Sequence, residues 1–297
     1  MLAVFFSASS STTVTSEIVL VGSTPGDKEI KDLLSIPSNV NIDFIRWNLK
    51  LNNAKTNQNS FFSLDIAFGE TKPNTLGFTN GGEKRSYEGT IRVSKNKNSN
   101  IGSEIYHLKS PGFSNEISII KISENLFHLL TSQNELMVGN GGWSYSLNRK
   151  DPVGSNIFLI SSSVSDHKLS QLVFEGRTPC QEIANEHPEM NTSRSCFKLK
   201  WKLTLNWDSA NHLPTIYTIR KVVDNKPNDL SGKWTIIKGS PTNPGAIIYK
   251  IEPDQPDESI SFLVADDNIL FFLGKNGEHY SGNENFSFVL NRKSIKP

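Results

Sequence analysis

The chain repeats itself, and this duplication constrains its fold more than any other feature. At a constant offset of 143 residues, residues 105–106 match 248–249, residues 139–140 match 282–283, and residues 147–150 match 290–293. Gly89 and Gly232 mark the upstream end of the match. Because a repeated sequence adopts the same supersecondary structure each time, we expect two domains of one topology.

A second block of identities sets the domain limits. It pairs residues 22–25 with 176–179, and residues 47–52 with 201–206, at an offset of 154 residues. The two offsets differ by eleven, so the first copy carries an insertion between Asn52 and Gly89, which we expect in the polar run 53–60. The predicted organisation is a first domain at 16–150, a linker at 151–169 and a second domain at 170–297.

Both copies have the sequence pattern of β-strands. Residues 44–51 and 197–205 alternate apolar and polar side chains with the period of two that half-buried strands show. Similar runs occur at 61–68, 143–149, 215–223, 232–237, 246–251, 259–264 and 268–273. Only 27–34 and 181–186 suggest short helices. Many short strands separated by turns are typical of a closed barrel or a sandwich, and we expect an all-β fold of two small antiparallel barrels in tandem.

Charge and hydropathy exclude some partners. The 31 Lys and Arg residues nearly balance the 30 Asp and Glu residues, and the formal net charge is +1. A balanced chain has no overall field that attracts nucleic acid or anionic membrane, although a local patch is left open. No apolar stretch approaches the roughly 20 residues that a membrane-spanning helix needs. We therefore expect no nucleic-acid partner and no transmembrane segment.

The two cysteines, Cys180 and Cys196, both lie in the second copy. Under the 154-residue offset the first copy has Gly26 and Ile42 in their places, so both cysteines are present together or absent together. This pattern favours a disulfide. Such a bond closes a loop of about 15 residues and stabilises the folded state by roughly 3 kcal/mol. Two separate buried thiols are the alternative, while a metal site is disfavoured because no histidine lies at ligand spacing.

The start of the chain favours export. Its first residues, MLAVFF followed by SASSS, look like the end of a signal peptide, with an apolar run before small residues. A disulfide also implies an oxidising compartment. We therefore expect an exported protein.

Four motifs of the second copy occur in the order found in a known family. They are the Gly-x-x-Pro-Cys opening at 176–180, the alternating strand at 199–205, the Gly-x-Trp strand at 232–234 and a late hairpin at 267–277. The series resembles the N-terminal domain of the NlpE family, envelope lipoproteins linked to copper resistance and surface sensing. The resemblance covers most of the second copy and, more weakly, the first. It implies lipocalin-like barrels and a bacterial periplasmic or outer-envelope location.

The chain departs from this family where copper would bind. The family has Cys-x-x-Cys after the proline, whereas Ile183 stands three residues after Cys180 and the next cysteine is Cys196. Three methionines and six scattered histidines show no cluster of soft ligands for copper. We expect no cofactor, no metal site and no tight copper binding, with the neighbourhoods of His128, His187 and Met190 left open.

A few residues are candidates for lining a ligand site. His128 lies in the apolar run 126–130 and aligns with Phe271, so it is a core or barrel-lining histidine or, alternatively, a ligand. Arg149 and Arg292 follow Leu-Asn at the end of each copy, where they plug a barrel end or grip a ligand. Trp201 and Trp234 occupy inward strand positions.

Two hypotheses of function follow. The first is a non-enzymatic exported module that binds or senses a small ligand or an envelope protein, because lipocalin-like barrels offer a mouth or interior, and the sequence has no nucleophile elbow and no acid/base pair. The alternative is a structural or assembly protein whose barrels are filled by their own side chains and hold no cavity. The sequence leaves the ligand and the oligomeric state open.

Overall fold

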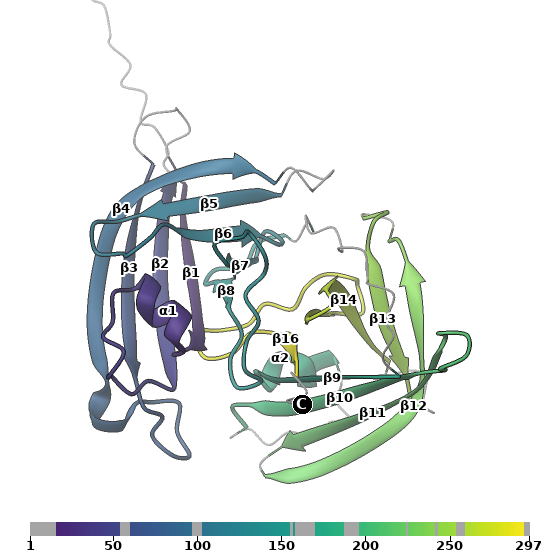
Figure 1. Ribbon diagram of the computed structural model, residues 1–297. Helices are drawn as coiled ribbons and strands as arrows, with labels where there is room; N and C mark the ends of the chain where they lie inside the picture. Colours follow the sequence, from purple (N-terminus) through teal and green to yellow (C-terminus); the bar gives the residue numbers. More distant parts are fainter. Residues whose placement is uncertain are drawn as a thin grey trace, which may run out of the picture.

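The computed structural model describes residues 16–53, 60–96, 103–154, 157, 170–186, 196–223, 225–240, 243–253 and 259–293. The chain forms two closed eight-stranded antiparallel β-barrels in tandem, which confirms the predicted fold class (Figure 1). In each barrel every strand pairs with the next one along the chain, and the last strand pairs with the first.

The first barrel consists of β1 (Ser16–Pro25), β2 (Phe44–Asn53), β3 (Phe61–Gly69), β4 (Glu83–Lys95), β5 (Glu104–Lys109), β6 (Ile117–Lys121), β7 (Leu126–Leu130) and β8 (Ser146–Arg149). The second consists of β9 (Gln171–Thr178), β10 (Leu199–Trp207), β11 (Pro214–Val223), β12 (Lys226–Lys238), β13 (Ile247–Glu252), β14 (Ile260–Asp266), β15 (Ile269–Leu273) and β16 (Val289–Arg292). Two short helices, α1 (Lys28–Leu33) and α2 (Gln181–Glu186), follow the first strand of each barrel, and η1 (Thr79–Gly81) is a 3-10 turn. No helix in the described ranges is long and apolar enough to cross a membrane.

A glycine lies where each barrel closes. A Cβ on Gly22 would lie 2.7 Å from the Ser146 carbonyl oxygen, and one on Gly176 would lie 2.4 Å from that of Val289. These two pairs are equivalent in the duplication. Closure of the first strand on the last therefore requires glycine at this position in both copies.

The extra residues of the first copy are not where the sequence led us to expect them. The hairpins between the second and third strands have similar lengths, 54–60 in the first barrel and 208–213 in the second. The connection between β3 and β4 spans residues 70–82, whereas β11 and β12 are joined by residues 224 and 225 alone, a difference of eleven. The expected insertion at 53–60 is therefore wrong. The sequence similarity ends at Asn52 and resumes at Gly89, so it could not place the insertion within that interval.

The two barrels pack together through the outer faces of their later strands. The shared apolar core contains Ile105, Ile120, Ile122, Leu126 and Leu130 from the first barrel, and Ala246, Leu263, Ala265, Ile269, Phe271, Leu273 and Val289 from the second. Several of these residues are equivalent in the duplication, such as Leu126 with Ile269. A contact made by the same patch on both partners has the form of a two-fold dimer interface, here within one chain.

Reciprocal hydrogen bonds hold this interface. Asn148 Oδ1 accepts from the Gly282 N–H at 3.1 Å, and its equivalent Asn291 accepts from the Gly139 N–H at 2.8 Å. Asn148 Nδ2 also donates to the Asn283 carbonyl oxygen at 3.1 Å and to a serine hydroxyl of the second barrel. Each barrel therefore holds the loop that precedes the closing strand of the other.

We expect Asn148→Ala to lower the free energy of unfolding by about 1–3 kcal/mol, because it removes three cross-barrel hydrogen bonds and leaves buried groups without partners. Asn291→Ala removes one such bond and should have a smaller effect. Urea unfolding followed by circular dichroism measures both, with the exposed Gln133→Ala as control. A loss for Asn148→Ala no greater than for the control would contradict the role of these bonds.

Candidate functional site

The interiors of both barrels are occupied by large side chains. Trp201 is 3% exposed, donates from Nε1 to Thr178 Oγ1 at 2.9 Å, and packs against Phe272 with ring centroids 5.3 Å apart. Its equivalent Trp47 makes the same bond to Thr24 at 2.9 Å. The interior of an eight-stranded barrel is just wide enough for side chains to fill, so these tryptophans act as core residues.

Trp234 also lies inside the second barrel. It is 2% exposed and donates to the Asn206 carbonyl oxygen at 3.0 Å. Its ring meets those of Trp207 and Tyr249 at centroid distances of 4.6 and 5.1 Å. Edge-to-face contacts of this kind stabilise a packed aromatic cluster. The neighbours described around both predicted lining tryptophans are therefore side chains of the same barrel.

Arg149 and Arg292 end the closing strands of the two barrels. The Arg149 N–H donates to the Asn125 carbonyl oxygen at 2.9 Å, and the Arg292 N–H donates to that of Asn268 at 2.7 Å. The Arg292 guanidinium lies 3.4 Å from the Asp267 carbonyl oxygen. The two backbone bonds are those of a closing strand, and whether the guanidinium groups plug a barrel end or grip a ligand stays a prediction.

His128 faces the other barrel. Its ring meets that of Phe271, its equivalent in the duplication, edge-on at a centroid distance of 5.9 Å. Nδ1 lies 2.8 Å from Ser146 Oγ, and Nε2 lies 2.8 Å from the Met137 carbonyl oxygen. Complete burial lowers the pKa of His128 to about 4. His128 is thus a fully partnered, neutral residue of the interface, and both nitrogens that could bind a ligand are occupied.

His279 is a buried histidine that the sequence did not single out. It is 6% exposed, and neither ring nitrogen has a hydrogen-bond partner. Its ring lies 5.6 Å from that of Phe271, and burial lowers its pKa to about 3. Its equivalent is Leu136, which packs in the same interface. A comparison of the copies could have marked His279, since it replaces a leucine of the first copy by a histidine.

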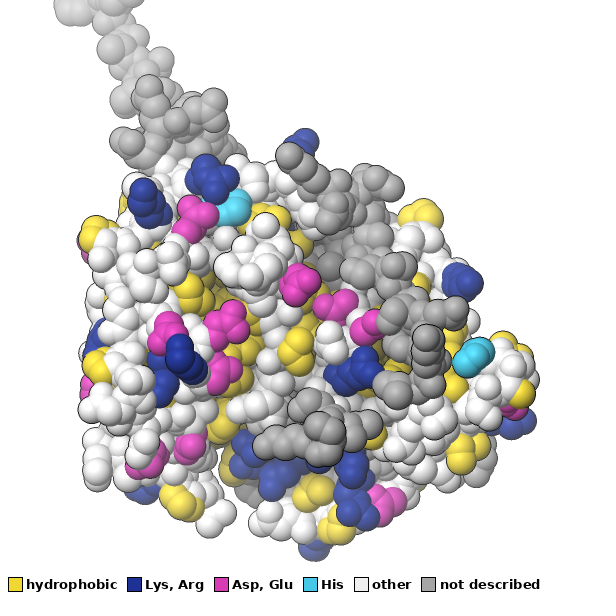
Figure 2. Space-filling model, viewed as in Figure 1, with side chains coloured by type: hydrophobic (Ala, Val, Ile, Leu, Met, Phe, Trp, Pro, Cys, Tyr) yellow, Lys and Arg dark blue, Asp and Glu magenta, His cyan; other side chains and the backbone are white. Residues whose placement is uncertain are grey.

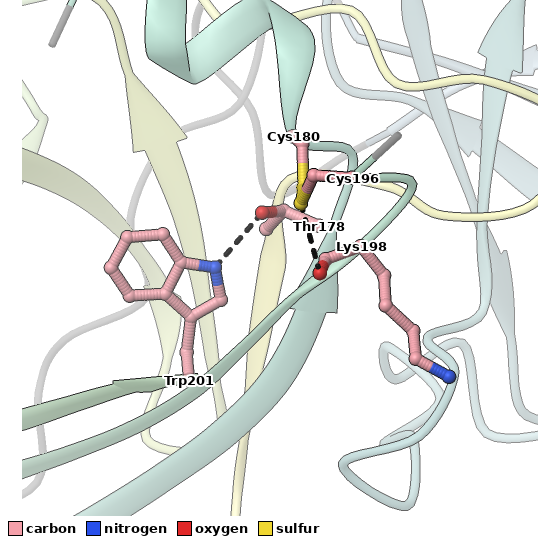
Figure 3. Close-up of a disulfide and its surroundings, with 5 residues drawn as sticks. All are labelled: Thr178, Cys180, Cys196, Lys198 and Trp201. Carbon is pink, nitrogen blue, oxygen red and sulfur yellow. Dashed lines mark hydrogen bonds between the residues drawn. A yellow bond between two sulfur atoms is a disulfide. The ribbon is translucent and has the colours of Figure 1, made fainter. Parts of the chain in front are cut away.

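The disulfide between Cys180 and Cys196 is present, as predicted, and it joins the residue before α2 to the segment that leads into β10 (Figure 3). In the first barrel the equivalent positions also touch, because a Cβ on Gly26 would lie 2.7 Å from that of Ile42. There α1 is held to the barrel by a hydrogen bond from the Tyr145 hydroxyl to Asp27. The disulfide points to an oxidising environment.

An aromatic stack lies along the boundary between the barrels. Trp143 stacks on Phe44 at a centroid distance of 5.0 Å, and Phe44 stacks on Phe78 at 4.2 Å. The guanidinium of Arg177 also lies over the Trp143 ring, 5.1 Å from its centroid. The stack therefore joins the insertion of the first barrel to β9 of the second.

The outer wall of the first barrel contains a serine, histidine and glutamate in contact. His107 Nε2 lies 2.8 Å from Ser94 Oγ, and Nδ1 lies 3.0 Å from Glu116 Oε1. Nδ1 also lies 3.0 Å from Ser118 Oγ, and the exposed Arg92 bonds Glu116 at 3.2 Å. A catalytic triad keeps its acid buried and directed at the histidine. Here the acid is partly exposed and shared, which is typical of a surface polar network.

Three cations gather on the outer wall of the second barrel, where sequence reasoning identified no site. They are Arg177, Lys198 and Lys200, and burial lowers the pKa of both Arg177 and Lys198. The available signal was the strand at 197–205, in which the polar positions before Thr204 are all lysine.

Within the described ranges no group of three or more His, Cys, Asp or Glu side chains is placed to hold a metal ion. His187 and Met190 lie outside those ranges. Comparison with models of protein families, with curated proteins and with solved structures finds no match for this chain. The class that the structure defines is a protein of two tandem eight-stranded antiparallel barrels.

We expect acid to destabilise the fold through His279. Its pKa is about 3 in the folded protein and about 6.5 when unfolded, so below pH 6.5 the unfolded state binds a proton that the folded state excludes. Stability is therefore lost as the pH falls from about 6.5. His279→Leu, which restores the residue found at position 136, should reduce this loss without weakening the protein at neutral pH.

Urea unfolding at a series of pH values tests this expectation, with exposed His212→Asn as the control. His128 remains in both variants, so part of the acid sensitivity should persist. Equal pH dependence of the wild-type protein and His279→Leu would rule out His279 as a source.

Proposed function

We propose that this protein is a non-enzymatic exported binding module that recognises its ligand or partner on the outer surface of a rigid two-barrel body. The observation that carries the proposal is the filling of both interiors. Trp47 and Phe62 lie inside the first barrel, and Trp201, Trp234 and Phe262 lie inside the second, each at most 3% exposed. Barrels packed in this way favour recognition by walls and loops over enclosure of a ligand.

The proposed location is the bacterial periplasm or outer envelope. The Cys180–Cys196 disulfide and the signal-like start of the chain support export. The resemblance of the second copy to the NlpE N-terminal domain supports an envelope binding or sensing role of that type. Such a resemblance supports a shared fold more strongly than a shared activity, because function depends on the site and not on the fold.

A structural or assembly role is the second candidate function. It is favoured by the same filled interiors and by the two-fold form of the interface, which leaves one rigid body with two similar outer walls. The two candidates differ in whether a specific surface recognises a ligand.

Native mass spectrometry of the purified protein tests the mode of binding. We expect the mass of the polypeptide with one disulfide and no retained apolar ligand, because large buried side chains such as Trp47 and Trp234 occupy the interiors. The same spectrum reports the oligomeric state. A stoichiometric apolar ligand carried through purification would contradict surface recognition and favour a hollow barrel.

We expect copper to bind weakly and without saturation, because both thiols are joined and both nitrogens of His128 are occupied. Titration with Cu(I) and Cu(II) against a competing chelator measures this. Sub-micromolar binding that is abolished in His128→Phe or His187→Ala would show that copper handling survives in this chain.

A further inference from the structure

The side chains of the three cations all extend from the outer face of the second barrel. Arg177 on β9 and Lys200 on β10 are paired directly across the two strands, which places their Cβ atoms about 5 Å apart. Lys198 lies two residues before Lys200 and so points to the same side. Figure 2 shows Lys and Arg side chains gathered in the lower part of the molecule, where Figure 1 places β10 and β11.

These cations have no counter-charge among the residues that the structure describes. Glu175, on the same wall, bonds Lys293 at 2.9 Å, and Asp229 bonds Arg220 at 2.7 Å. Burial, and then the positive charges of Arg177 and Lys200, lower the pKa of Lys198. Like charges held together repel one another, and a bound anion would relieve that repulsion.

Two of the cations, Arg177 and Lys198, are also held in place. The Arg177 guanidinium lies on the face of Trp143, and Lys198 Nζ lies 5.1 Å from the centroid of the Phe197 ring. The sulfur of Cys196 lies 3.5 Å from the Lys198 carbonyl oxygen, so the disulfide fixes the backbone from which this side chain extends (Figure 3). Groups that are positioned before binding lose less entropy when a ligand arrives.

The first copy has nothing equivalent. Ser23, Phe44 and Arg46 stand where the second copy has Arg177, Lys198 and Lys200. The insertion covers Phe44 and Arg46, because Phe78 stacks on Phe44 and Arg46 donates to the Leu76 carbonyl oxygen at 2.6 Å. The second copy lacks these eleven residues, so the insertion that covers the equivalent wall of the first barrel is missing here.

We propose that Arg177, Lys198 and Lys200 form a binding site for a phosphate group, either free or as part of a lipid headgroup. The inference rests on the proposed function, since it names the chemistry recognised by the outer surface. The guanidinium offers a planar pair of donors to two oxygens of the group, and the two ammonium groups supply point charges.

The test uses the full-length oxidised protein, isothermal titration calorimetry and inorganic pyrophosphate as the probe, at low ionic strength where charge interactions are least screened. We expect saturable binding at one site that weakens as salt is added. In the double variant Lys198→Gln/Lys200→Gln the affinity should fall on the order of tenfold or more, because each charged hydrogen bond contributes about 1.5–3 kcal/mol.

The control is Lys233→Gln/Lys238→Gln, which removes the same charge from exposed positions of β12 in the same barrel. Equal weakening in both double variants, or no saturable binding by the wild-type protein, would overturn the proposal. Sedimentation with vesicles of phosphatidylcholine, alone or mixed equally with phosphatidylglycerol, separates the sources. Binding to the mixed vesicles that is lost in Lys198→Gln/Lys200→Gln assigns a headgroup, while pyrophosphate binding without vesicle binding assigns a free phosphate.

The two proposals fail separately. If the protein binds no pyrophosphate and its native mass shows no ligand, the phosphate site is ruled out, but recognition by the outer surface is still supported. A retained apolar ligand removes surface recognition whatever pyrophosphate does.

Discussion

Two-sided burial of the later strands is the constraint on which the rest of this structure depends. The inner side chains of β7 and β15 fill their own barrels, and their outer side chains pack against the other barrel. All five residues of each strand are therefore buried. A fully buried leucine, isoleucine or phenylalanine contributes roughly 1.5–3 kcal/mol, so this interface makes one body of two domains.

The same constraint explains what sequence reasoning found and what it missed. The duplication and the alternating runs were enough to predict two barrels. Over most of β2 and β10, fully buried residues alternate with less buried ones, so these strands keep the period of two. The runs at 126–130 and 269–273 do not alternate, and a continuous apolar run was itself the sign of burial on both faces. For His128 the sequence predicted a core or barrel-lining position. It could not predict the contact with the second barrel, because the sequence of one strand does not show what its outer face packs against.

Identities between the copies mark structural needs, and differences mark places free to specialise. Gly22 and Gly176 permit closure, the Trp–Thr pairs fix the interiors, and Asn148 and Asn291 hold the opposite loops. The disulfide, the insertion at 70–82 and the cationic wall each occur in one copy only. Sequence comparison found the cysteines but not the cationic cluster, because the proximity of Arg177 to Lys200 comes from strand register and not from spacing.

The fusion of two equivalent barrels has a consequence for how the protein behaves at low abundance. A dimer of separate subunits falls apart on dilution, since its stability depends on the concentration of each partner. Here the partner surface is tethered, so the effective concentration is set by the connecting segment and stays constant however few molecules are present. At any dilution the two walls keep their relative position. A substitution can also occur in one half without appearing in the other, whereas in a homodimer it would appear in both.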